Sequence, residues 1–157
     1  MGVEIERKFL VNHTKWNALN KPDPDYFIQG YLHSDLTKTI RIRATKENGF
    51  ITIKGKSSAN GLARSEFEYE IPKTEALELL SNFTDKVLEK HRYEILFEGD
   101  IWEVDVFEGD NAGLIVAEIE LESEDQSFIK PDWITEEVTG DLRYFNSFLI
   151  NQPFQKW

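Results

Sequence analysis

Charged residues recur at every second position along much of the chain, and they are grouped by sign. The basic residues with this spacing are Arg41 and Arg43, Lys54 and Lys56, and Lys90 and Arg92. The acidic sets with this spacing are Glu4/Glu6, Glu66/Glu68/Glu70, Glu103/Asp105 and Glu118/Glu120/Glu122. In a β-strand, residues two apart lie on the same face, and like charges placed there repel one another. The pattern therefore favours faces that bind an opposite charge over faces that meet only water.

Clustered carboxylates and clustered bases indicate a particular kind of chemistry. Carboxylate oxygens are ligands that suit Mg2+ and Mn2+, whereas arginine and lysine bind phosphate oxygens. Together they describe a site for a metal-bound polyphosphate. In such a site, the metal and the bases stabilise the charge that develops as the bond to the leaving phosphate breaks.

The elements that would position these residues follow from the alternation itself. Apolar and charged residues alternate in eight segments, which predicts strands over 3–11, 26–33, 38–45, 50–56, 63–71, 87–98, 101–107 and 114–122. Apolar residues at helical spacing predict helices over 73–83 and 141–150. Because most strands follow one another as hairpins, we expect an antiparallel sheet. We expect a single domain over 1–157 whose fold class is α+β, with mainly β structure.

The predicted strands admit two arrangements. In the ordinary one, the charged faces meet water and the apolar faces pack inside. In the other, the sheet closes into a barrel whose charged face surrounds a polar cavity, and helices cover the apolar outer face. The grouping of charges by sign and the small number of helices favour the closed barrel.

The overall composition limits the partners of the chain. The net charge is −11, from 29 acidic and 18 basic residues, and such a field repels nucleic acid and anionic lipid. The absence of cysteine excludes disulfides and thiolate nucleophiles. No apolar run reaches the roughly 20 residues of a membrane-spanning helix, and the first residues lack the apolar core of a signal peptide. We therefore expect a cytoplasmic protein with no nucleic acid and no membrane as partner, either a monomer or a homodimer.

A series of short segments resembles a known family. E-x-E-x-K at residues 4–8 is followed in order by R-I-R at 41–43, T-I-K-G-K at 52–56, R-S-E-F-E at 64–68 and K-x-R at 90–92. W-E-V-D-V-F at 102–107, G-L-I-V-A-E-I-E-L-E at 113–122 and V-T-G-D-x-R-Y-x-N at 138–146 come next. The ordered series covers essentially the whole chain and resembles the CYTH superfamily, the triphosphate tunnel metalloenzymes.

This resemblance implies an eight-stranded antiparallel barrel that forms a tunnel and acts on triphosphates with Mg2+ or Mn2+. By motif match, the metal-binding carboxylates would be Glu4, Glu6, Glu118, Glu120 and Glu122. The phosphate-binding residues would be Lys8, Arg41, Arg43, Lys54, Lys56, Lys90, Arg92 and Arg143. Catalysis would fall to Glu4, Glu6 and Lys8, with a carboxylate orienting a water and the bases stabilising the leaving phosphate.

Among members of the family, the chain most resembles the small bacterial ones, which are often tripolyphosphatases. We therefore expect a metal-dependent hydrolase that converts inorganic tripolyphosphate, a small molecule, to pyrophosphate and phosphate. One alternative is a class IV-type adenylate cyclase or a nucleoside or thiamine triphosphatase, which would need a pocket for the organic group. Another is a domain that binds polyphosphate or nucleotide without catalysis.

Overall fold

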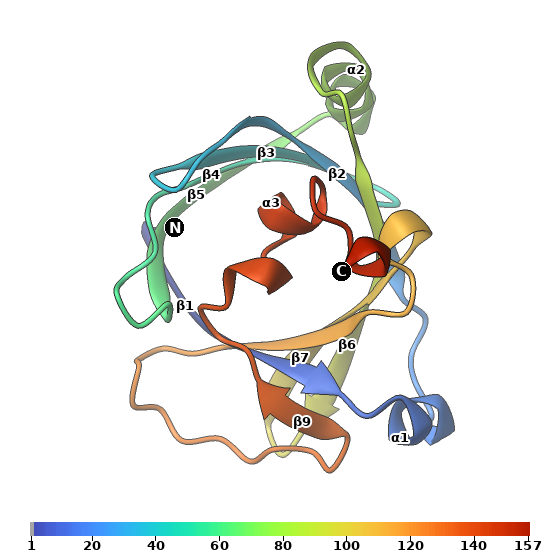
Figure 1. Ribbon diagram of the computed structural model, residues 1–157, viewed down its shortest axis with the longest axis vertical. Helices are drawn as coiled ribbons and strands as arrows, with labels where there is room; N and C mark the ends of the chain where they lie inside the picture. The colour runs from blue at the N-terminus through green and yellow to red at the C-terminus, as the bar shows by residue number, and fades with distance from the viewer. Residues whose placement is uncertain (1) are drawn as a thin grey trace.

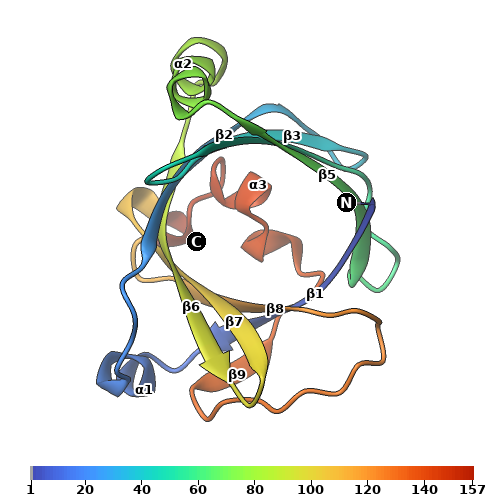
Figure 2. The same cartoon turned by 180° about the vertical axis from the view of Figure 1, so that it is seen from behind.

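An antiparallel sheet that closes on itself forms the centre of the protein (Figures 1 and 2). The computed structural model describes residues 2–157. Its strands are β1 (Gly2–Val11), β2 (Asp25–Ser34), β3 (Thr39–Ala44), β4 (Gly49–Lys54), β5 (Ala63–Ile71), β6 (Leu88–Phe97), β7 (Asp100–Phe107), β8 (Ile115–Glu120) and β9 (Ile134–Glu137). The order is β5-β4-β3-β2-β6-β7-β8-β1, and β1 pairs again with β5, so that eight strands close the ring. Every pairing is antiparallel, which confirms the predicted barrel.

The helices of the protein are short and flank this barrel. They are α1 (His13–Ala18), α2 (Lys73–Phe83), α3 (Asn146–Leu149) and three single turns of 3-10 helix at Gly109–Asn111, Leu142–Tyr144 and Phe154–Lys156. The sequence pattern predicts α2 with its bounds as observed. It does not predict α1 or the ninth strand β9, which pairs with β1, because six or four residues are too few to show a periodicity. Among residues 2–157, no helix is long and apolar enough to cross a membrane.

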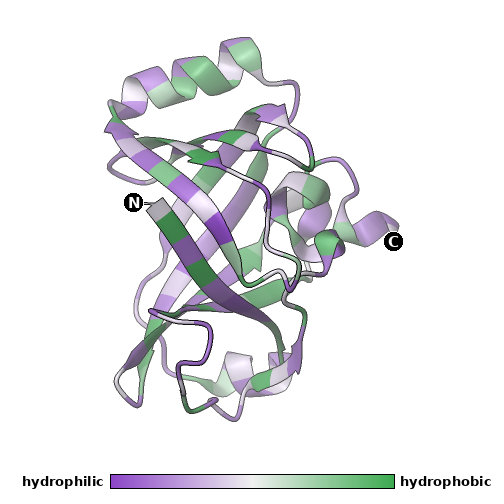
Figure 3. Cartoon of the chain, turned by 90° about the vertical axis from the view of Figure 1, so that its left-hand side faces the viewer, coloured by the Kyte–Doolittle hydropathy of each residue, from purple (hydrophilic) through white to green (hydrophobic). Residues whose placement is uncertain are grey.

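The register of β1 places its alternate charged residues on the inner face of the barrel. Glu6 and Lys8 lie opposite Glu120 and Glu118 of β8. Phe9, the next residue along β1, points outward into a core where it is fully buried. Figure 3 shows this alternation of hydrophilic and hydrophobic residues along the strand that begins at the N-terminus.

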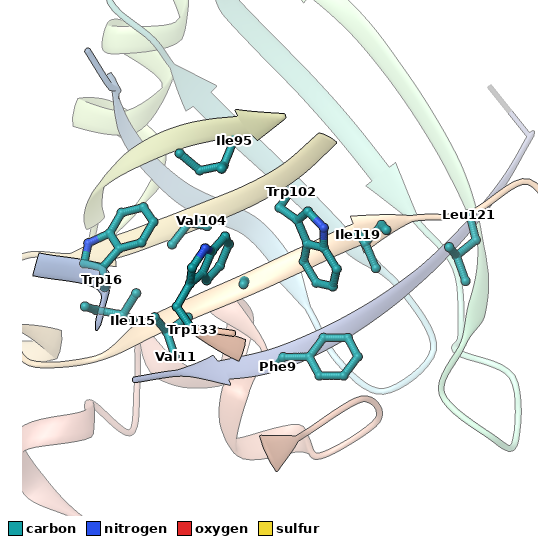
Figure 4. Packing of buried hydrophobic residues seen from close by; sticks show 11 residues of the cluster. Phe9, Val11, Trp16, Ile95, Trp102, Val104, Ile115, Ile119, Leu121 and Trp133 are labelled. Carbon is teal, nitrogen blue, oxygen red and sulfur yellow. The ribbon is translucent and has the colours of Figure 1, made fainter. Parts of the chain in front are cut away.

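A cluster of large aromatic residues covers the outer face of β1, β7 and β8 (Figure 4). Trp102 and Phe9 are fully buried there, with ring centroids 5.6 Å apart in an edge-to-face arrangement. Trp16 of α1 and Trp133, which precedes β9, pack edge to face at 5.6 Å. This packing fixes the positions of β1, β7 and β8, whose inner faces carry acidic residues of the barrel interior.

Helix α2 covers a second part of the outer face. Ala76 and Leu80 of this helix pack against Ile42 of β3 in a separate apolar cluster. Farther along the same outer face, Ile53 and Phe67 lie opposite each other on β4 and β5 and remain 39% and 43% exposed. The predicted cover of helices is therefore present over only part of the barrel.

The C-terminal segment differs from the predicted helix over 141–150, and that prediction is wrong. One turn of 3-10 helix ends at Tyr144, Phe145 is extended, and α3 begins at Asn146. The ammonium group of Lys8 takes the carbonyl oxygen of Tyr144 as a hydrogen-bond acceptor at 3.1 Å. In a continuous helix, this carbonyl oxygen of Tyr144 would accept from a backbone N–H of the next turn, but here it accepts from Lys8. Phe145 lines the cavity inside the barrel.

Candidate active site

A cavity of about 210 Å3 lies inside the barrel, and most of its wall is charged. Its acidic lining residues are Glu4, Glu6, Glu66, Glu68, Glu103, Glu118 and Glu120. Its basic lining residues are Lys8, Arg41, Arg43, Lys54, Arg64, Lys90 and Arg92. The remaining lining residues are Tyr31, Thr39, Ser57, Gly61, Leu62, Thr139, Gly140, Phe145, Asn146 and Ser147. The charged strand faces are therefore turned inward, as the grouping by sign predicts.

Two pairs of carboxyl groups face each other across neighbouring strands of this wall. Burial and the charge of Glu118 raise the pKa of Glu6 well above its ordinary value. Burial alone would also raise the pKa of Glu118, but Lys8 and a hydrogen bond with Glu6 lower it. In the second pair, burial and a hydrogen bond with Glu4 raise the pKa of Glu66 to about 7. In each pair, one carboxyl group therefore takes up a proton more readily than the other.

Lys54 connects the second carboxyl pair to the basic side of the cavity. Its ammonium nitrogen lies 2.9 Å from Glu4 Oε2 and 3.3 Å from Glu66 Oε2. Burial tends to lower the pKa of Lys54, but the charges of Glu4, Glu6 and Glu66 together outweigh burial, and the pKa is raised. This lysine is therefore charged in the cavity and lies between the carboxylates and the arginines of β3.

The carboxyl pairs have the donor chemistry that a divalent cation requires. A cation bound there would compete with protons, since metal binding to carboxyl groups releases protons. Within residues 2–157, no three acidic or histidine side chains are gathered closely enough to hold a metal by themselves. Mg2+ is usually bound by one or two carboxylates together with waters and substrate phosphates. The residues therefore fit a cation that binds with a phosphate chain rather than alone.

Three arginines are held close together on the opposite, basic side of the cavity. Burial lowers the pKa of Arg43 to about 9, and the charges of Arg41 and Arg92 contribute to this shift. The ring of Phe27 lies under two of them, with its centroid 4.4 Å from Arg43 Cζ and 5.0 Å from Arg92 Cζ. Such contacts stabilise a cation over an aromatic face. The repulsion between the arginines would be relieved by a bound anion.

Arg41 has an unused donor in this wall. Its Nη2 donates to Thr52 Oγ1 at 3.1 Å and lies 3.4 Å from Glu68 Oε2. Its Nε is buried and has no hydrogen-bond partner within residues 2–157. A buried N–H without a partner destabilises the protein, so Arg41 adds to the energetic cost of the charged wall.

Lys90 and Arg92 are both anchored by Asp105. Lys90 donates to Asp105 Oδ2 at 2.6 Å, while Arg92 donates to both carboxylate oxygens at 2.7 and 2.9 Å. Burial lowers the pKa of Lys90 to about 7, although the negative charge of Asp105 tends to raise it. Asp105 is itself almost completely buried and lies behind the cavity wall. Its role is therefore to orient the two cations.

Three residues that the motif match predicts for the site lie outside the cavity wall. Lys56 and Glu122 are exposed, because β4 ends at Lys54 and β8 ends at Glu120. Beyond the end of a strand, the alternation no longer directs a side chain inward. Arg143 is exposed in the C-terminal segment, where its guanidinium binds Asp141 Oδ2 at 2.8 Å.

Several residues of the site carry no charge, and the charge pattern does not predict them. Tyr31 of β2 lines the cavity, and Phe27 supports the arginines from the same strand. Phe145 and Asn146 line one end, although they are far from the barrel strands in the sequence. Phe27 and Tyr31 lie an even number of positions apart in β2, and this spacing could have indicated that they share one face of the strand.

The chain thus forms an eight-stranded antiparallel barrel that encloses a charged cavity. Residues 2–148 match the family profile of the CYTH domain. The chain therefore belongs to the CYTH domain family.

Proteins similar to this chain include two inorganic triphosphatases. The protein from Acetivibrio thermocellus is 48% identical over 100% of this chain and 99% of its own length. The protein from Nitrosomonas europaea is 38% identical over 93% of this chain and 95% of its own length. A solved structure of the inorganic triphosphatase NE1496 superposes with a TM-score of 0.62 at 36% identity, covering 94% of this chain and 93% of the other.

Proposed function

We propose that the protein is a metal-dependent triphosphatase that hydrolyses inorganic triphosphate to pyrophosphate and phosphate. Its similarity over the full chain to a protein named as an inorganic triphosphatase supports this activity. The observation that carries the proposal is the cavity wall, which brings Arg41, Arg43 and Arg92 together with the carboxylates that a metal-bound phosphate chain requires.

The size and lining of the cavity favour a small inorganic substrate. Its volume of about 210 Å3 lies below the roughly 300–1,000 Å3 of pockets that enclose drug-sized organic ligands. Leu62 and Phe145 are the main apolar side chains in a wall that is otherwise polar or charged. Such a wall suits phosphate groups better than a purine or a thiazolium ring.

Each group of residues has a distinct role in the proposed reaction. The phosphate-binding residues are Lys8, Arg41, Arg43, Lys54, Lys90 and Arg92. The metal-binding carboxylates are Glu4, Glu6, Glu118 and Glu120. When bound, Mg2+ or Mn2+ neutralises charge on the phosphate oxygens. Glu4 or Glu6 orients the attacking water, and Lys8 stabilises the negative charge on the departing phosphate.

The partners, the cellular location and the oligomeric state of the protein are predicted from the sequence. We propose a small-molecule partner, no nucleic acid and a cytoplasmic location, which the net charge of −11 and the cysteine-free composition support. A monomer and a homodimer are both compatible with the chain. Sedimentation of the purified protein distinguishes the two.

The direct test is phosphate release from inorganic triphosphate, ATP and thiamine triphosphate, each with Mg2+, Mn2+ or EDTA. We expect metal-dependent release from inorganic triphosphate and much slower release from the two organic substrates. Pyrophosphate and a cyclic nucleotide formed from ATP would instead show an adenylate cyclase. Binding of triphosphate without any cleavage would show a domain that only binds it, and either result would overturn the proposed activity.

A further inference from the structure

Gln29 is an uncharged residue of β2 whose side chain lies on the inner face of the barrel, behind the surface of the cavity. Strand β2 lies between β3 and β6 in the barrel wall (Figure 2). Gln29 is paired with Arg43 of β3 on one side and with Leu88 of β6 on the other. Its side chain is fully buried. Backbone pairing on both sides therefore fixes Gln29 directly beside Arg43.

The side-chain amide of Gln29 holds the guanidinium group of Arg43. Arg43 Nε donates to Gln29 Oε1 at 2.9 Å. Because a guanidinium group has donors only, the carbonyl end of the amide has to face Arg43. The amide nitrogen is left over: Gln29 Nε2 is buried and has no hydrogen-bond partner within residues 2–157. An unmatched buried donor costs free energy, so stability alone does not explain an amide at this position.

A carboxylate would be the stronger partner for a buried guanidinium group, since hydrogen bonds between charged groups are roughly twice as strong as neutral ones. Other cations of the cavity wall have such partners. Lys54 lies 2.9 Å from Glu4, and Arg92 lies 2.7 Å from Asp105. In the part of the chain that the structure describes, Arg43 forms no ion pair, and its contacts are the amide of Gln29 and the aromatic ring of Phe27. The charge of Arg43 is therefore not cancelled by an adjacent anion.

We propose that Gln29 is a positioning residue that holds Arg43 through a neutral acceptor and so keeps the full charge of this arginine available to the phosphate chain. The inference rests on the proposed function, because it concerns how the same cavity binds its anion. The amide orients the guanidinium group without competing for its charge. A carboxylate in the same place would orient Arg43 equally well but would compete with phosphate for it. The neutrality of Gln29 thereby favours a substrate of high negative charge.

Gln29→Glu is the decisive variant, because it keeps the size of the side chain and the acceptor and adds only a negative charge. We expect the Kd for inorganic triphosphate to rise by about 30-fold or more. KM should rise with it while kcat stays within about threefold, since Arg43 binds the anion before and during the reaction. The melting temperature without ligand should be equal to or above that of wild type, because the new carboxylate pairs with a buried cation.

A purely structural role of Gln29 predicts a different result for this variant. Glutamate is at least as good an acceptor for Arg43 as glutamine, so the Kd would then stay within about threefold of wild type. That result would overturn the proposal. A Gln29→Glu protein that does not fold would overturn it as well, because the proposal requires the carboxylate to pair with Arg43.

Gln29→Met tests the orienting role separately, because it keeps the site neutral and removes the acceptor. Arg43 then loses the hydrogen bond to its Nε, and the Kd for triphosphate should rise by about tenfold. An unchanged Kd would show that Gln29 does not position Arg43. The matched control is Gln152→Glu, the same chemical change at an exposed position outside the cavity. It should leave Kd and KM within about twofold of wild type.

Calorimetry with inorganic triphosphate in EDTA gives each Kd without turnover, and steady-state kinetics with Mg2+ gives KM and kcat. The two measurements separate this inference from the proposed activity. If wild type binds triphosphate and does not cleave it with any metal, the activity fails, while a raised Kd in Gln29→Glu still supports the role of Gln29. If wild type cleaves triphosphate and Gln29→Glu binds it as tightly as wild type, the activity stands and the inference is wrong.

Discussion

The ammonium group of Lys90 and the carboxylate of Asp105 are joined by a hydrogen bond of 2.6 Å at a place that solvent does not reach. Neighbouring strands β6 and β7 supply the two residues, and Arg92 binds the same carboxylate. The network holds two cations of the cavity wall in place through one buried anion. It therefore links the stability of the barrel to the geometry of its basic side.

Replacement of Asp105 by Asn should strongly destabilise the protein. The variant keeps the size of the side chain but leaves the buried Lys90 without its anion and leaves Arg92 with Glu103 as its remaining carboxylate partner. Breaking a buried pair typically lowers the free energy of unfolding by about 3–5 kcal/mol. Urea denaturation of the two proteins measures this change. The control is Asp110→Asn at an exposed position, where we expect a change within about 0.5 kcal/mol.

The same carboxylate should give part of the stability a dependence on pH. Burial alone would raise the pKa of Asp105, but Arg92 and Lys90 outweigh burial and lower it from 3.8 to about 2. A lowered pKa means that the native state binds the proton less readily than the unfolded state. The contribution is therefore complete above about pH 4 and is lost as the pH falls toward about 2.

This dependence is measured as a difference between wild type and Asp105→Asn, which removes the effect of other acidic residues. Between about pH 5 and pH 2, the difference in the free energy of unfolding should shrink by about 2 kcal/mol. A difference that stays constant over this range would show that the pKa of Asp105 is not lowered in the native state.

Replacement of Glu6 by Gln should affect activity and stability in opposite directions. The change removes a proposed metal ligand, so metal-dependent phosphate release should fall by about 100-fold or more. It also removes the repulsion with Glu118 that raises the pKa of Glu6, so the metal-free protein should be as stable as wild type or more stable. Glu122→Gln, outside the cavity, should change neither quantity. Equal activity of the two variants would contradict the role proposed for Glu6.

Lys54 and Lys56 form a matched pair for testing the basic side. Lys54→Met removes a cation that lies between Glu4 and Glu66 in the cavity, and kcat/KM for triphosphate should fall by about 30-fold or more. Lys56→Met changes the same residue type at an exposed position beyond the end of β4, and kcat/KM should stay within about twofold. Steady-state kinetics with Mg2+ distinguishes these results, and a larger effect at Lys56 would falsify the placement of the phosphate chain.

The alternation of residue types determines much of this protein before any tertiary contact is considered. Because side chains alternate across a strand, the charges at Glu4, Glu6, Arg41 and Arg43 share faces that turn inward together. The same alternation predicts the eight strands of the barrel, and their order in hairpins predicts antiparallel pairing.

The tertiary structure decides where each strand stops and what lies beside it. Lys56 and Glu122 continue the sequence pattern of their strands, but β4 and β8 end two residues earlier. The C-terminal segment has the spacing of a helix, yet Lys8 and Lys90 bind Tyr144 and Asn146 and draw the chain across the barrel end. Such contacts join residues more than fifty positions apart, so local periodicity does not determine them. The sequence by itself thus determines which face of each strand is charged, and tertiary packing decides which of those charges meet in one cavity.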